Sequence, residues 1–212
     1  MDAREAAPGT RAVSGQRPAR TNATKQKLFD AALRLVGERG VAGVTVEEIA
    51  AEAGVAKGTV YYNFGSKDGL IDALLHYGIE LLAIQLHKAD VEPDVSVAVA
   101  LLVERALVFF LEYSAFAQLL VTELWRTPGN WHATLMPLRE EIVSIIRRQL
   151  QRAADAGRFP PDADVGTAAA ALFGTLLVVA LDWRVFRPDR SLAEVRDSVL
   201  VLVRGLTVAP TS

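Results

Sequence analysis

The stretch TVEEIAAEAGVAKGTVYYNFGSKDGL, from Thr45 to Leu70, restricts the fold of this chain more than any other segment. Thr45 and Glu48 have the spacing of a capping box, in which each side chain satisfies the backbone N–H of the other. Gly54 can take the left-handed conformation of a tight turn, so the helix that begins after Thr45 ends within two turns. A second short helix is expected at about 56–62, and Ser66 caps a longer one at about 67–88. Two short helices joined by a tight turn indicate a helix-turn-helix unit.

Helical periodicity extends over the remaining chain. Thr24 precedes apolar residues at helical spacing, and Gly40 ends this first helix. Five more helices are expected at about 95–113, 115–126, 131–156, 164–186 and 192–208, separated by breaks that contain Pro or Asp and Gly. The sequence shows no convincing strand alternation and no internal repeat. These patterns predict an all-α fold.

Composition excludes several classes of protein. The chain has 212 residues, a net charge of −2 and no cysteine, which rules out disulfides, thiol nucleophiles and cysteine metal sites and fits a reducing cytoplasm. The longest apolar run, 168–181, is shorter than the roughly 20 residues that span a bilayer, and it is expected to be a buried helix. Residues 1–22 have almost no large apolar side chains and are expected to form a disordered basic tail, not a signal peptide.

The second short helix offers side chains suited to a DNA duplex. Ile49, Val55 and Val60 would form the small core between the two helices, which leaves polar and aromatic side chains exposed. Lysine neutralises phosphate, hydroxyls bond phosphates or base edges, and a glycine lets the backbone approach the groove. Lys67 begins the next helix, where its charge and the free N–H groups can both hold a phosphate. The exposed candidates are Lys57, Gly58, Thr59, Tyr61 and Tyr62.

From about Thr24 to Leu75 the chain resembles the DNA-binding domain of the TetR family of transcriptional regulators. The Thr-x-x-x-Ile-Ala start, the Ala-Gly-Val turn, the Lys-Gly-Thr-x-Tyr-Tyr-x-Phe helix and the Ser-Lys opening of the next helix match in order and spacing. Asn63 stands where histidine is common, and Ala56 where a serine often caps the helix. The resemblance implies that the following residues face DNA: Thr45, Lys57, Gly58, Thr59, Tyr61, Tyr62 and Lys67.

The resemblance also implies a domain organisation. Residues 1–22 would be the tail, 23–70 the DNA-binding domain with its helix-turn-helix motif at 45–64, and 71–212 a helical ligand-binding and dimerisation domain. Residues 1–75 hold ten basic and nine acidic side chains, so DNA affinity has to come from local placement of charge. We therefore expect Glu47, Glu48 and Glu52 to be turned away from the phosphates, and the arginines of the tail to add contacts with the minor groove or backbone.

Two sets of residues in the C-terminal part are candidates for further sites. Val195, Val199, Leu202 and Leu206 form one stripe of the last helix and are expected at a dimer interface; ordinary core within the chain is the alternative. Aromatic and polar residues between 109 and 132 suit a small-molecule pocket, although aromatic core is the commoner role. A buried Glu123 beside Trp125 would favour a cationic ligand. The pocket candidates are Phe109, Phe110, Tyr113, Phe116, Glu123, Trp125, Trp131 and His132.

The function predicted from these features is a dimeric repressor. It would bind a double-stranded palindromic operator in the cytoplasm and leave it when a small hydrophobic or aromatic effector binds, without cofactor, metal or membrane. An activator of the same family is an alternative, as are a helical enzyme and a protein-binding adaptor. Catalytic signatures such as a Gly-rich phosphate loop, Gly-x-Ser-x-Gly and His-Glu-x-x-His are absent, and His76 and His87 would lie about 16 Å apart along one helix. A gel shift with upstream DNA separates the regulator from the adaptor.

Overall fold

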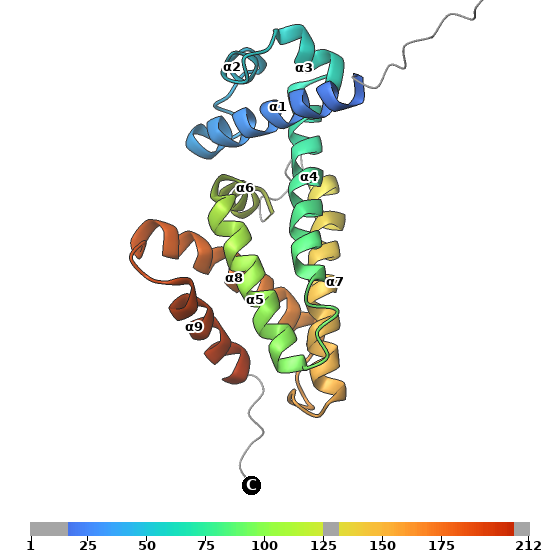
Figure 1. Ribbon diagram of the computed structural model, residues 1–212, viewed down its shortest axis with the longest axis vertical. Helices are drawn as coiled ribbons and strands as arrows, with labels where there is room; N and C mark the ends of the chain where they lie inside the picture. The colour runs from blue at the N-terminus through green and yellow to red at the C-terminus, as the bar shows by residue number, and fades with distance from the viewer. Residues whose placement is uncertain (1–16, 125–131, 206–212) are drawn as a thin grey trace, which may run out of the picture.

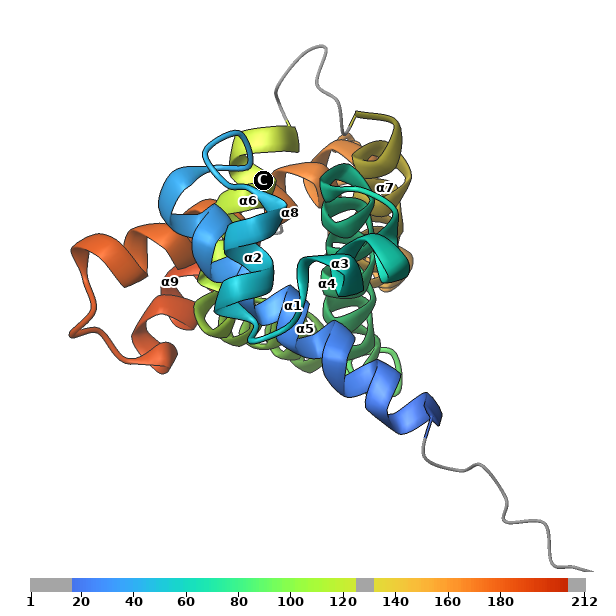
Figure 2. The same cartoon turned by 90° about the horizontal axis from the view of Figure 1, so that it is seen from above.

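The computed structural model describes residues 17–124 and 132–205, and every element in these ranges is a helix. Three helices gather at one end of the molecule, and α4 runs from that end along the C-terminal part beside α7 (Figure 1). Viewed onto that end, α2 and α3 lie in front of the other helices (Figure 2). The helices are α1 (Arg17–Arg39), α2 (Val46–Glu52), α3 (Lys57–Phe64), α4 (Lys67–His87), α5 (Val95–Glu112), α6 (Ser114–Leu124), α7 (His132–Asp155), α8 (Val165–Phe186) and α9 (Leu192–Gly205).

The all-α prediction is confirmed, and four of the described helices begin at a residue whose side chain caps them. Thr45 and Glu48 form both hydrogen bonds of the capping box, and Ser66 Oγ accepts from Gly69 N at 2.9 Å. Asp94 and Asp164 cap α5 and α8 in the same way. These local bonds satisfy N–H groups that have no partner inside their own helix.

The start of α1 differs from the prediction. The first helix begins at Arg17, so residues 17–22, which were expected in the disordered tail, are helical. Pro18 is compatible with this because proline is tolerated in the first helical turn, where its missing N–H is not needed. Residues 19–22, Ala-Arg-Thr-Asn, contain neither proline nor glycine.

Within residues 17–124 and 132–205, two helices, α4 and α8, are long and apolar enough to cross a membrane by length and composition alone. Half of the most apolar stretch of α4 and a third of that of α8 are buried inside the fold. Leu74, Leu75, Phe173 and Leu176 are among the side chains that these helices place in the core. We therefore assign α4 and α8 as core helices, as the sequence predicts for 168–181.

The helix α6 packs closely against both α1 and α4. A Cβ atom added at Gly37 of α1 would lie 2.7 Å from Ala115 Cβ, and one at Gly78 of α4 would lie 2.4 Å from the Phe116 ring. Real Cβ atoms do not approach so closely, so these glycines make the contacts possible. The end formed by α1, α2 and α3 and the C-terminal part therefore share one continuous core.

Candidate DNA-binding surface and effector site

The exposed face of α3 carries most of the residues predicted to meet DNA. Val60 is completely buried and anchors the helix, whereas Tyr62 is 90% exposed and Tyr61 44% exposed. Nothing lies within 4 Å of the position that a Cβ would take at Gly58, so another backbone can approach this turn. Thr59 is half-buried. Two aromatic hydroxyl groups and an open turn thus form one accessible surface.

Lys57, at the start of α3, already has an acidic partner. Its Nζ forms an ion pair with Glu47 Oε1 on α2 and lies 5.6 Å from the centre of the Tyr61 ring. The hydrogen bond between the two side chains lowers the pKa of Glu47 and raises that of Lys57, so both are charged at neutral pH. Glu47 is therefore directed at α3, the recognition helix. This contradicts the sequence-based expectation that Glu47 is turned away from the DNA phosphates.

The other two carboxylates of α2 are held by arginines of α1. Arg39 Nη1 donates to Glu48 Oε1 at 2.7 Å, and Arg34 forms an ion pair with Glu52. Arg39, together with the Thr45 backbone and hydroxyl, lowers the pKa of Glu48 to about 2. These pairs neutralise acidic charge on α2 and explain how a domain of nearly zero net charge can approach a polyanion.

Thr45 and Lys67 both have structural roles in the fold. The Thr45 hydroxyl donates to Glu48 Oε2 at 2.8 Å as part of the cap. The Lys67 ammonium is directed inward, where it donates to the carbonyls of Val41 at 2.9 Å and Val44 at 2.8 Å. Lys67 therefore tethers the loop between α1 and α2. The sequence predicted only a phosphate contact for this residue and not this structural role. Its partners are 26 and 23 positions away in the chain, and no local pattern in the sequence reveals them.

The aromatic residues predicted to line a pocket form packed core in this structure. Phe109, Phe110 and Phe116 are buried, and the Phe109 ring contacts those of Phe110, Tyr113 and Phe116 at centroid distances of 4.8–6.2 Å. The free space beside them is about 10 Å³, too small for an effector. The cause is α6, whose Phe116 fills the space over Gly78.

The two remaining pocket candidates that the structure describes, Glu123 and His132, do not line a common cavity. Glu123 is buried and lines a cavity of about 230 Å³ between α1 and α6. His132 is exposed at the start of α7. Trp125 and Trp131 lie outside the described residues, so the proposed pairing of Glu123 with Trp125 is outside them as well.

Three openings in the described part of the C-terminal domain adjoin one another beneath α9. A cavity of about 180 Å³ lies between α8 and α9, one of about 50 Å³ follows it, and one of about 360 Å³ ends the row between α5, α7 and α9. The first and second cavities share Val199 and Leu202, and the second and third share Leu150 and Val203. We call this row of cavities the α9 groove.

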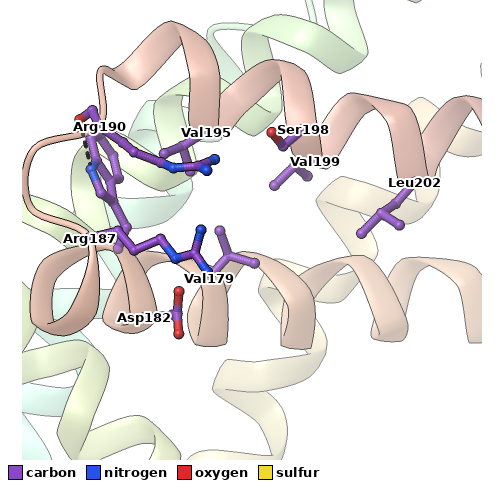
Figure 3. Close-up of a pocket in the computed structure, with 9 residues that line it drawn as sticks. Val179, Asp182, Arg187, Arg190, Val195, Ser198, Val199 and Leu202 are labelled. Atoms are coloured by element: carbon purple, nitrogen blue, oxygen red, sulfur yellow. Dashed lines mark hydrogen bonds between the residues drawn. The ribbon is translucent and has the colours of Figure 1, made fainter.

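The end of the α9 groove between α8 and α9 is rich in positive charge. The guanidinium groups of Arg187 and Arg190 point into the space above Val179, and Asp182 lies beside them (Figure 3). No carboxylate of the described residues holds either arginine in an ion pair within 4 Å. At the opposite end, Arg158 Nη1 donates to Ser96 Oγ at 3.0 Å and lies 3.7 Å from Asp94. The groove is thus apolar along its length and cationic at its α8–α9 end.

The predicted dimer stripe divides into buried and exposed members. Val195 and Val199 are already buried within the single chain, where α9 packs on α5 and Arg196 bonds Glu104 at 2.7 Å. Leu202 is 59% exposed, and Leu206 lies outside the described residues. Further exposed apolar side chains are Val178, Val185 and Phe186 on α8 and Val201 on α9.

Comparisons with known proteins connect both halves of the chain to one group of regulators. Residues 28–74 match the family model described as "Bacterial regulatory proteins, tetR family", and residues 116–199 match "Tetracyclin repressor-like, C-terminal domain". The HTH-type transcriptional regulator SrpR of Pseudomonas putida is 26% identical over 163 residues, which cover 72% of this chain and 71% of SrpR. The regulator BetI of Brucella anthropi is 42% identical over 65 residues, so the match spans only about a third of its length.

A solved structure shows the same fold over nearly the whole molecule. The transcriptional regulator FadR from Bacillus subtilis, in complex with stearoyl-CoA, aligns with a TM-score of 0.74 at 21% identity. The alignment covers 84% of this chain and 96% of FadR. Similarity at this level of identity concerns the arrangement of the helices alone.

Proposed function

Because this chain belongs to the TetR family of bacterial transcriptional regulators, we propose that it is a homodimeric repressor whose operator is released when an acyl-CoA-type effector binds the C-terminal domain. Like the other members of this family, the chain is a DNA-binding regulator and not an enzyme. We further propose that it works in the cytoplasm. The observation that carries the effector proposal is the α9 groove, with its apolar walls and with Arg187 and Arg190 at one end.

The surface of α3 supports contact with the operator. Tyr61 and Tyr62 present hydroxyl groups to solvent beside the open turn at Gly58, and such groups bond phosphates or base edges. A helix-turn-helix protein reads two half-sites about 34 Å apart, so one recognition helix per subunit requires a dimer. A palindromic operator follows from the two-fold symmetry of that dimer.

The exposed apolar faces of α8 and α9 support the homodimer. Val178, Val185 and Phe186 on α8 and Val201 and Leu202 on α9 are each at least 56% exposed. A contiguous apolar face on a water-soluble protein marks an interaction surface. Leu202→Glu is expected to convert the dimer to monomers because it places an unpaired charge in the interface. Ile84→Glu is the control, since Ile84 is an exposed apolar residue of α4 outside this face; a dimeric Leu202→Glu protein in sedimentation experiments contradicts the assignment.

The chemistry of the α9 groove favours an amphipathic anion. An acyl chain would lie against Leu150, Leu172 and Val203, and anionic phosphates would meet Arg187 and Arg190 at the α8–α9 end. FadR from Bacillus subtilis binds stearoyl-CoA, a ligand of this type, within the same arrangement of helices. The aromatic cluster around Phe109 offers no comparable space.

The route from effector to DNA is proposed to pass through α4 and α6. α4 begins at the recognition unit and continues along the C-terminal part, and Phe116 of α6 fits against Gly78 of α4. A small tilt of α4 would change the separation of the two recognition helices. An effector that weakens DNA binding tenfold has to prefer the released state by about 1.4 kcal/mol, and DNA must weaken the effector equally.

The test is release of DNA by stearoyl-CoA. Fluorescence anisotropy with labelled DNA from the chain's own upstream region should show release by stearoyl-CoA but not by free coenzyme A. Release of DNA by stearoyl-CoA should be lost in a variant that carries both Arg187→Ala and Arg190→Ala. It should be retained in the control variant Arg184→Ala, because Arg184 is an exposed residue of α8 outside the groove. Failure of the wild-type protein to bind this DNA contradicts the regulator proposal. DNA binding without any response to stearoyl-CoA contradicts only the effector class.

A further inference from the structure

We propose that Glu47 limits the DNA affinity of this protein by occupying Lys57, so that a DNA phosphate must displace the carboxylate before it can use the lysine. The inference rests on the DNA-binding function argued above. Glu47 would then set the affinity for DNA, although its own negative charge does not attract DNA.

Lys57 is the single basic residue of α3, and α2 has none. Its ammonium is the nearest source of positive charge for a phosphate beside the recognition helix, and it is paired with Glu47 across the two helices. Glu48 and Glu52 are bonded to α1 and not to α3. Glu47 is therefore the carboxylate that competes directly with DNA for a cation of α3.

The ion pair is placed where exchange is easy. The Lys57 side chain is 51% exposed and that of Glu47 56% exposed, so an incoming phosphate can reach the ammonium. Exposed ion pairs are weak, so the pair lowers the affinity for DNA without preventing binding. The Lys57 ammonium also lies 5.6 Å from the Tyr61 ring centre, a cation–π distance, so it stands next to another proposed DNA contact.

A limited affinity suits a protein that an effector has to remove from DNA. Coupling between ligand sites is typically about 1–3 kcal/mol, which changes affinity by roughly 5- to 150-fold. A repressor that bound far more tightly than its working concentration would stay on DNA despite such a change. Phosphate contacts also supply most non-specific affinity, so a paired Lys57 reduces retention on other DNA as well.

The experiment measures DNA affinity of Glu47→Gln by anisotropy over a series of salt concentrations. Affinity for operator and non-operator DNA should rise by a similar factor, about two- to fivefold at low salt, as expected from the loss of an exposed ion pair. The slope of log affinity against log salt should become steeper by up to about one unit. Glu52→Gln is the matched control because it makes the same charge change on the same helix, and it should have a smaller effect.

A double-mutant cycle with Lys57→Gln identifies the cause. If Glu47 acts by occupying Lys57, Glu47→Gln should have little effect in the Lys57→Gln background. An effect of equal size in both backgrounds, or equal effects of Glu47→Gln and Glu52→Gln, overturns the proposal in favour of general charge repulsion. No change in affinity for Glu47→Gln overturns it outright, whereas a wild-type protein that binds no DNA overturns the proposed function instead.

Discussion

Replacing Lys67 by methionine should destabilise the helix-turn-helix unit without removing a phosphate contact. Methionine keeps most of the aliphatic stem but loses the ammonium that donates to Val41 and Val44 at 2.9 and 2.8 Å. A hydrogen bond from a charged group is worth about 1.5–3 kcal/mol. The freed carbonyls belong to a loop that water can partly reach, so the total loss should be about 2 kcal/mol. For a chain of this size that corresponds to a fall in Tm of about 4–8 °C.

Two measurements separate this tether from a phosphate contact. Thermal unfolding followed by circular dichroism gives the change in Tm, and operator affinity over a series of salt concentrations gives the salt slope. A tether predicts a lower Tm, weaker binding because the loop no longer fixes α2, and an unchanged slope. Lys57→Met is the control, because Lys57 is exposed and should leave the Tm unchanged. A Lys67→Met protein of normal Tm whose slope is flatter by about one unit would refute the reasoning.

Three further predictions concern other parts of the molecule. Tyr62→Ala should weaken operator binding about tenfold with no change in Tm, because Tyr62 is 90% exposed and its proposed contact is with DNA and not with its own chain. Gly78→Ala should lower the free energy of unfolding in urea by about 1–3 kcal/mol, because the new Cβ would lie 2.4 Å from the Phe116 ring. Glu48→Gln should reduce stability near neutral pH but not near pH 2. The pKa of Glu48 is lowered to about 2, so its contribution is complete above about pH 4.5 and is lost as the pH falls towards 2; urea unfolding at several pH values measures this, and a pH-independent difference would contradict it.

The helices and their caps could be predicted because they depend on neighbours in the sequence. Thr45 and Glu48 are three residues apart, and their reciprocal bonds are the ones that this spacing predicts. Local spacing gave no information about Lys67, because its carbonyl partners belong to the distant loop between α1 and α2. Local pattern also placed the start of α1 too late, since polarity alone does not prevent residues 17–22 from being helical.

Periodicity identifies a buried face but not what covers it. Phe109 and Phe116 fit a pocket or a core equally well in sequence, and the close approach of α6 to Gly78 makes them core. Val195 and Val199 likewise fit a dimer face, and α5 of the same chain covers them. The α9 groove could not be predicted because its walls come from α5, α7, α8 and α9, and its arginines follow the end of α8 with no motif of their own.

Leu202 belongs to two surfaces at once, since it lines the α9 groove and is 59% exposed on the outer apolar face. A ligand that moves this side chain alters the apolar face that contacts a second subunit. The second subunit in turn alters the groove wall that contacts the ligand. Effector affinity and subunit affinity are then linked by mass action. Titrations at nanomolar protein, as in DNA-binding assays, and at micromolar protein, as in calorimetry, should therefore yield different apparent dissociation constants for one effector. The direction of that difference will show whether the ligand tightens or loosens the dimer.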